Sequence, residues 1–171
     1  MLAVFDGIEH GTITDDANVN ALLKQMITVS SNEAANGLLS RIGNGDDKAA
    51  IATVTATAQR YGFTSSEELR TLTGMASGNA VENWTSTRDC GSFLFQVYAG
   101  TLVSKNASER MMQLLLGQTR RTKIPAGVPS GVKVANKTGE LAAVQNDVAI
   151  VFGTHPVSYT HLRAHETTLH L

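Results

Sequence analysis

The sequence predicts an α+β fold, with a mostly helical lobe followed by the remnants of an antiparallel sheet. Residues 1–117 repeatedly place apolar side chains at helical spacing. The segments GVKVANKTG, from Gly131, and VQNDVAIVFG, from Val144, are instead rich in strand-favouring residues. Helices first and strands last is the order typical of α+β proteins. The chain has 171 residues, of which 42% are hydrophobic, so it is long enough to bury one core.

The first two predicted helices lie before residue 28. Residues 1–10 carry Leu2, Phe5 and Ile8 at a spacing of three, which predicts an amphipathic helix. A polar connection follows, and a short helix is expected over about 19–27.

A third helix is expected from about 32 to 42, after the segment MITVSSNEAANGLL. Ser30 and Glu33 have the S-x-x-E spacing of a capping box, and Ser31 or Asn32 could also cap the helix. The helix then presents an apolar stripe formed by Ala34, Ala35, Leu38, Leu39 and Ile42. On local grounds these hydroxyls need no role beyond capping.

The fourth helix is expected over roughly 47–61, with Asp46 or Asp47 as its cap and Gly62 as its C′ residue. Its predicted apolar face consists of Ile51, Val54, Ala58 and Tyr61. Residues 63–84 lack clear periodicity and indicate a long surface loop, a type of segment that is often functional.

Two further helices and a hairpin complete the prediction. Ser86 and Asp89 mark a helix start near 85, and that helix is expected to run to about 102. Another capped helix should end at Gly117, and a basic loop interrupted by prolines follows it. The strands at 131–139 and 144–153 form an antiparallel hairpin with a turn at ELAA.

Composition excludes several classes of function. The formal net charge of −1 offers no basic field for nucleic acid. No apolar run approaches the length of a membrane span, and MLAVFDGIEHG at the start does not resemble a signal peptide. The one cysteine, Cys90, excludes an internal disulfide, and a small buried hydrophobe is its more ordinary role than a nucleophile.

Two short motifs carry the chemistry. Lys137-Thr138-Gly139 lies near the end of a strand, where a lysine alone could simply protect an edge. Ser30-Ser31-Asn32 precedes it at a helix start. Together the motifs resemble the class A β-lactamases and related penicillin-recognising serine hydrolases, which carry S-x-x-K, S-D-N and K-T-G in that order. The resemblance covers about residues 1–153.

The resemblance implies a serine acyl hydrolase that acts on β-lactam rings through an acyl-enzyme. Ser30 would pass a proton to the leaving nitrogen. The Lys137 ammonium would polarise the Ser30 hydroxyl and attract an anionic substrate. It also implies that no metal or organic cofactor takes part, that the partner is a small-molecule substrate, and that the protein is a periplasmic or extracellular monomer.

Four further residues are expected to bind substrate. Asn32 would hold the side-chain amide of the substrate, and the Thr138 hydroxyl would bind its carboxylate. Gly139 would allow close approach of ligand and backbone. The N–H of Glu140 would be one oxyanion donor, with no role required of its side chain. Arg120, Arg121 or Lys123 could add charge for a carboxylate, although exposed bases in a loop are usually just solvated.

The sequence departs from the family pattern at the nucleophile. No S-x-x-K motif precedes Ser30, so we expect the chain to begin just after the nucleophile and to be inactive by itself. Ser31 also replaces the usual aspartate of S-D-N, which is expected to loosen the turn without removing chemistry.

The third departure concerns the deacylating acid, which the family places in E-x-x-x-N. Glu67, Glu68 and Glu82 lie in the corresponding loop, and none has an asparagine four residues later. Two alternatives therefore stay open. One is a D-Ala-D-Ala carboxypeptidase or penicillin-binding protein that acylates with slow turnover, and the other is a catalytically dead binding module.

The end of the chain has a different composition. Residues 157–171 include VSYTHLRAHET, which resembles a translated sequencing adapter, so we expect a truncated domain at 1–153 and a non-native tail. His161 and His165 share a helical face and could hold a metal. His170, however, lies five residues after His165, which does not fit H-E-x-x-H.

Overall fold

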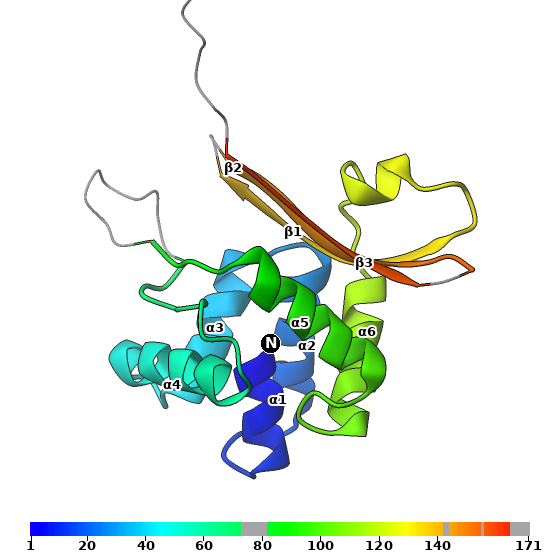
Figure 1. Cartoon of the computed structure of the whole chain (residues 1–171). Coiled ribbons are helices and arrows are strands. Elements are labelled where there is room, and N and C mark those ends of the chain that lie inside the picture. The colour runs from blue at the N-terminus through cyan, green and yellow to red at the C-terminus, as the bar shows by residue number, and fades with distance from the viewer. Residues whose placement is uncertain (73–81, 142–143, 155, 165–171) are drawn as a thin grey trace, which may run out of the picture.

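The computed structural model describes the chain except for residues 73–81, 142–143, 155 and 165–171 (Figure 1). The described elements are α1 (Leu2–Glu9), α2 (Ala17–Thr28), α3 (Asn32–Ile42), α4 (Asp47–Arg60), α5 (Thr87–Ala99), α6 (Lys105–Leu116), the 3₁₀ helix η1 (Ile124–Gly127), β1 (Lys133–Leu141), β2 (Val144–Phe152) and β3 (Val157–Ala164). The predicted α+β class is confirmed.

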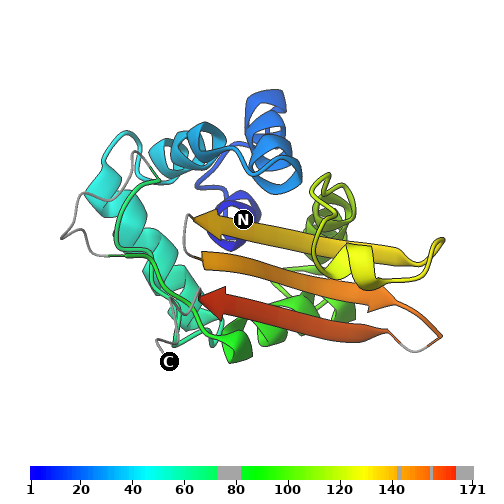
Figure 2. The ribbon, with the colours of Figure 1, turned by 90° about the horizontal axis from the view of Figure 1, so that it is seen from above.

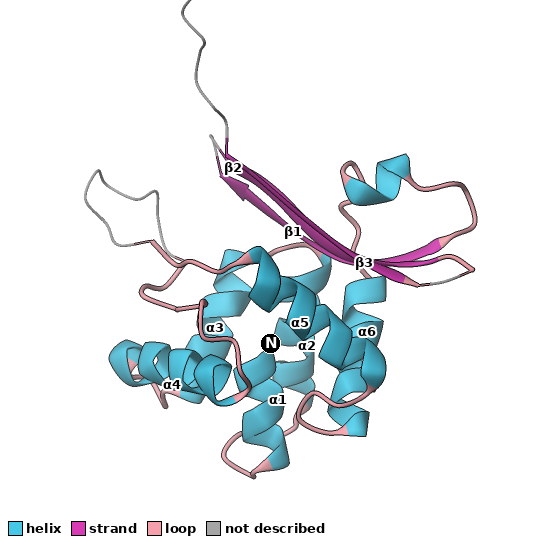
Figure 3. Cartoon of the chain, viewed as in Figure 1, coloured by secondary structure: helices cyan, strands magenta, loops and turns pink. Residues whose placement is uncertain are grey.

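The sheet lies on one side of the helical lobe (Figure 3). Its three described strands are antiparallel in the order β1-β2-β3. Helix α5 packs against β2 and β3, and α6 packs against β1. Seen from above, β1 is the strand nearest α2 and α3 (Figure 2). The strand that contains Lys137 therefore runs beside the α2–α3 turn, which contains Ser30.

The core lies between the helices and the inner face of the sheet. It includes Phe5, Leu23, Leu94, Leu102 and Met111, all of them almost fully buried. Burying side chains of this size supplies the main favourable free energy of folding. This core fixes the helical lobe beneath the sheet and thereby sets the distance between α2–α3 and β1.

Most helix starts follow the predicted capping chemistry. Asp16 accepts a hydrogen bond from the Val19 N–H at 2.8 Å, and α2 accordingly begins earlier than predicted. Asp46 caps α4, and Ser86 caps α5. Gly62 follows α4 with φ of 87°, a left-handed conformation that a glycine adopts without strain.

Helix α4 differs from its prediction in the face that it buries. Ala50 and Thr57 are its fully buried residues, whereas the predicted stripe that includes Ile51 and Val54 is only partly buried. The physical reason is that α4 packs at the side of the lobe against α1 and α3, where small side chains allow close approach.

The hairpin is longer than predicted and is joined by a third strand. Glu140 and Leu141 belong to β1, opposite Gln145 and Val144, so the first half of the ELAA segment is strand rather than turn. The chain after 156 forms β3, which pairs with β2 from Val157 to Ala164. That residues 157–171 are a non-native tail stays a prediction.

Candidate functional site

The centre of the site is a hydrogen bond between two distant segments. The Nζ of Lys137 donates to the Oγ of Ser30 at 2.7 Å. The same ammonium also donates to the carbonyl oxygen of Thr138. Ser30 and Lys137 are both partly buried. The two residues predicted to act together are therefore adjacent, one on the α2–α3 turn and the other on β1.

The shape of the turn explains why Ser30 faces Lys137. Ser30 has φ of 60°, a left-handed conformation that is unusual for a residue with a side chain. The cap of α3 is Ser31, whose Oγ accepts from the Ala34 N–H at 3.0 Å and donates to Glu33. The predicted capping box between Ser30 and Glu33 is wrong, because Ser31 and not Ser30 takes the N-cap position of α3. The Ser30 hydroxyl is therefore not used as a cap.

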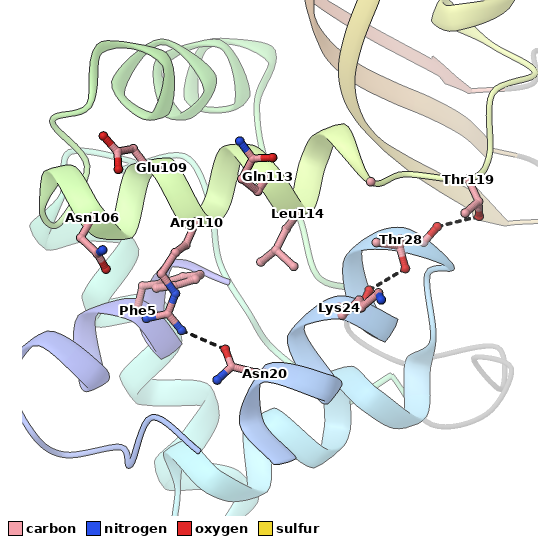
Figure 4. Close-up of a pocket in the computed structure, with 11 residues that line it drawn as sticks. Phe5, Asn20, Lys24, Thr28, Asn106, Glu109, Arg110, Gln113, Leu114 and Thr119 are labelled. Atoms are coloured by element: carbon pink, nitrogen blue, oxygen red, sulfur yellow. Dashed lines mark hydrogen bonds between the residues drawn. The ribbon is translucent and has the colours of Figure 1, made fainter. Parts of the chain in front are cut away.

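A clamp of three hydrogen bonds holds this turn against the segment that leads to β1. The carbonyl oxygen of Thr28 accepts from both the N–H and the hydroxyl of Thr119, at 3.0 and 2.8 Å (Figure 4). Gln118 donates to the carbonyl oxygen of Ile27 at 2.7 Å. These bonds close the end of α2 onto the end of α6 and keep the turn in register with the sheet.

The environment of Lys137 changes its acidity. Burial lowers the pKa of Lys137 to about 8, and the positive charge of Arg120 acts in the same direction. The negative charges of Asp147 and Glu140 oppose this shift. A lysine with such a pKa can exchange protons close to neutral pH, as general acid–base chemistry requires.

The other predicted residues lie around this pair. Thr138 is 3% exposed and stands opposite Asp147 in the sheet, and Gly139 stands opposite Asn146. Asn32 is exposed at the first position of α3. A Cβ added to Gly139 would meet Asn146 at an ordinary contact distance of 3.7 Å, so the need for glycine there stays a prediction about a ligand.

The side chain of Glu140 has a role that sequence reasoning missed. Its two oxygens accept hydrogen bonds from Arg120, at 3.0 Å, and from Lys123. The hydrogen bond and charge of Lys123 are the main reason that the pKa of Glu140 lies below its ordinary value. Arg120 and Lys123, which sequence reasoning allowed to be simply solvated, are thus ion-paired.

A buried polar pair beneath the site was also missed. Asn136 donates to Asp147 at 3.0 Å, and neither residue is exposed to solvent. Asp147 also accepts from the N–H of Ile124 at 3.0 Å, which ties η1 to the sheet. Burial raises the pKa of Asp147. The only sequence signal was an aspartate inside the apolar strand VQNDVAIVF.

The described glutamates of the loop between α4 and α5 each bind a neighbour in that loop. Glu67 accepts from the indole N–H of Trp84 at 3.2 Å, and Glu68 accepts from Asn83 at 3.0 Å. Glu82 pairs with Arg70 at 2.7 Å. That none of these three carboxylates is the deacylating acid stays a prediction.

The same loop is anchored close to the site. The N–H of Leu72 donates to the Oδ1 of Asn36, on α3, at 2.8 Å. Residues 73–81, the remainder of the predicted functional loop, lie outside the described residues. The anchor brings the described end of the loop against the helix whose first turn carries Asn32.

Two pockets flank this region. One of about 310 Å³ is lined by Lys137, Cys90, Phe63, Phe93 and other residues beneath β1. Burial is the main cause of the raised pKa of Cys90. A larger pocket of about 680 Å³ lies between α2 and α6 (Figure 4), and Thr28 and Thr119 form one end of its lining.

Neither a metal site nor a membrane span is found among the described residues. They contain no cluster of three histidine, cysteine, aspartate or glutamate side chains with metal-binding geometry. His161 and His165, whose spacing alone could hold a metal, lie outside the side chains that the structure describes. In the same part of the chain, no helix has the length and apolar character needed to cross a membrane.

Solved structures share this fold. The β-lactamase of Sphaerobacter thermophilus is 24% identical with a TM-score of 0.76, covering 88% of this chain and 56% of its own. PBP-A is 21% identical with a TM-score of 0.76, covering 93% of this chain and 66% of its own. An ancestral class A β-lactamase is 20% identical with a TM-score of 0.80, covering 99% and 74%.

The chain thus spans 56% and 66% of the length of the first two of these proteins. No curated protein sequence matches it. A sequence model of the β-lactamase enzyme family matches residues 6–162. Because that match covers most of the chain, the protein belongs to the β-lactamase enzyme family.

Proposed function

We propose that the Ser30–Lys137 site binds and helps to open β-lactam rings by acyl transfer to a serine, as in class A β-lactamases. The observation that carries the proposal is the 2.7 Å hydrogen bond from Lys137 to Ser30. Because the ammonium donates to the Ser30 oxygen, the Ser30 proton can point toward a leaving nitrogen. The oxygen left behind would be stabilised by the positive charge and could take a proton back.

The remaining residues would bind the substrate. Lys137 and the Thr138 hydroxyl would hold the carboxylate that penicillins carry, and Asn32 would hold the side-chain amide. The N–H of Glu140 would act as an oxyanion donor, and Gly139 would let the ring approach β1. Residues of this kind raise the rate by fixing the reacting groups and by matching developing charge. We infer for the protein a periplasmic or extracellular location, where such substrates occur.

The proposal assigns acylation to a serine that this sequence does not present in an S-x-x-K motif ahead of Ser30. We therefore expect the chain of 171 residues to bind β-lactams without hydrolysing them. A chromogenic cephalosporin tests this expectation directly. Steady colour development by the purified chain would contradict it.

Binding itself is tested by calorimetric titration with benzylpenicillin. Lys137→Ala should weaken binding by at least about tenfold, because it removes a partly buried cation that faces the ligand carboxylate. Lys133→Ala is the matched control, since Lys133 is an exposed lysine at the start of the same strand. Equal affinity for the two variants would remove Lys137 from the site.

One observation favours a second candidate, a penicillin-binding D-Ala-D-Ala carboxypeptidase with slow turnover. The described loop glutamates bind Trp84, Asn83 and Arg70, and none of them is among the charges that shift the pKa of Lys137. A PBP-A variant with a related fold has been solved as an acyl-enzyme complex with penicillin G. In a longer form that carries the S-x-x-K serine, a stoichiometric burst would support this candidate, and steady turnover would support a β-lactamase.

A further inference from the structure

Three charged side chains lie beside Lys137 and form one cluster. Arg120 donates to one oxygen of the Glu140 carboxylate at 3.0 Å, and Lys123 donates to the other. Arg120 and Lys123 come from the segment between α6 and β1, while Glu140 follows Lys137 on β1. The side chains of Arg120 and Glu140 are 46% and 41% exposed, so solvent and ligands reach this cluster.

The cluster acts on the same ammonium that contacts Ser30. The charges of Arg120 and Lys123 both lower the pKa of Lys137, and the charge of Glu140 raises it. Geometry places the cluster at the same part of β1, because the Arg120 carbonyl oxygen accepts from Asn136, next to Lys137, and Glu140 lies three residues after Lys137. An anion bound at Lys137 would also be attracted by Arg120 and Lys123. Both of these side chains are already paired with the carboxylate of Glu140.

The backbone that carries the two cations has hydrogen bonds of its own. The N–H of Arg120 donates to the side chain of Gln118 at 2.9 Å, and the Arg120 carbonyl oxygen accepts from Asn136 at 3.4 Å. The N–H of Ile124, next to Lys123, donates to the buried Asp147. The backbone that carries both cations is thus anchored by bonds that do not involve the Glu140 side chain.

From this geometry we infer that Glu140 is a built-in occupant of an anion subsite formed by Arg120 and Lys123. A ligand carboxylate at Lys137 competes with Glu140 for these cations, so Glu140 limits the affinity of the site for anionic ligands. The inference rests on the proposed function, because it concerns a ligand bound at Lys137. It gives the side chain of Glu140 a part in specificity that is separate from its backbone N–H.

Glu140→Gln tests the inference because it removes the charge and leaves the backbone N–H in place. At low salt the variant should bind benzylpenicillin at least about threefold more tightly than the unmodified chain, because Arg120 and Lys123 are released from their ion pairs with Glu140. The gain should shrink at high salt, because exposed charges are screened. The methyl ester of benzylpenicillin lacks the carboxylate and should bind both proteins equally.

Two further variants make the result specific. Glu109→Gln, at an exposed position on α6, changes the net charge by the same amount and should leave the affinity unchanged. Adding Arg120→Ala to Glu140→Gln should abolish the gain, because it removes one of the freed cations.

The outcomes separate the two proposals. If the unmodified chain binds benzylpenicillin and Glu140→Gln binds it equally or more weakly, Glu140 is not a competing occupant and the inference is overturned. If the methyl ester gains as much as the parent compound, the inference is overturned as well. If no variant binds benzylpenicillin, the proposed function fails, and the inference fails with it.

Discussion

Lys137 donates a hydrogen bond to Ser30 across 107 positions of the sequence, at 2.7 Å. This contact joins the sheet to the helical lobe at the turn before α3. Helix packing, the Thr28–Thr119 clamp and the left-handed conformation of Ser30 all position the hydroxyl for it. Substitutions at neighbouring positions should therefore differ sharply in their effects on ligand affinity and on the free energy of unfolding.

The first prediction concerns pH. The pKa of Lys137 is about 8, so the ammonium is present below that value and lost as the pH rises through it. Affinity for benzylpenicillin should be constant below about pH 7 and fall as the pH rises toward about 9, because the anion loses its partner. Titration calorimetry across this range measures the fall.

Lys137→Arg provides the control for the pH experiment. Arginine stays protonated over the whole range, so any binding that this variant retains should not change with pH. A flat profile for the unmodified chain would mean that Lys137 does not hold the ligand anion.

The same pKa shift predicts an effect on stability. The pKa of Lys137 is lowered from 10.5 in the unfolded chain to about 8 in the folded one. Between these values the unfolded chain binds more protons, so the free energy of unfolding should rise with pH. Urea unfolding at several pH values, with Lys137→Met as the reference, measures this contribution. A contribution that falls with pH would contradict the assigned environment of Lys137.

The two serines of the turn should separate in stability. Ser31→Ala removes the cap of α3 and should lower the free energy of unfolding by about 1 kcal/mol. Ser30→Ala removes no cap but takes away the hydroxyl that accepts from the Lys137 ammonium, so its loss of about 1 kcal/mol should disappear in a Lys137→Met background, whereas the loss from Ser31→Ala should remain. Chemical denaturation compares the variants in both backgrounds. A loss from Ser30→Ala that persists without Lys137 would show that Ser30 also caps the helix.

Asp147 should be essential for stability. Asp147→Ala leaves the N–H of Ile124 and the amide of Asn136 without their buried acceptor. We expect a loss of about 2–4 kcal/mol in the free energy of unfolding. Asp47→Ala, at an exposed position, is the control and should change it by about 0.5 kcal/mol or less. A small effect at Asp147 would mean that the loop is held by other contacts.

Cys90 should behave as an unreactive thiol. It is partly buried, and burial raises its pKa, so little thiolate is present at neutral pH. A thiol-reactive disulfide reagent should modify the folded chain at least about tenfold more slowly than the chain in denaturant. Comparable rates would restore the alternative that Cys90 is a nucleophile.

Local features were predictable from the sequence because their causes are local. Helix α3 has the predicted bounds, and Asp46, Ser86 and Gly62 take the predicted terminal positions. Capping and left-handed turns depend on residues within a few positions of one another. The choice between Ser30 and Ser31 as the cap was open for the same reason, since both hydroxyls are within reach of the first turn.

Features that depend on tertiary packing were not predictable in this way. The contact between Ser30 and Lys137 was predicted only because both motifs resemble those of one family. No local sequence pattern encodes a contact between residues 107 positions apart. The burial of Asp147 requires η1 to cover the sheet, and the ion pairs of Glu140 require Arg120 and Lys123 to lie above β1. These contacts link segments whose relative placement the sequence does not reveal.

The most direct test of the central claim is a crystal structure of the chain with benzylpenicillin bound. The account predicts that the ligand carboxylate lies within hydrogen-bond distance of the Lys137 ammonium and the Thr138 hydroxyl, with the ring nitrogen facing Ser30. A ligand bound instead in the pocket between α2 and α6, with the Ser30–Lys137 contact left undisturbed, would contradict it.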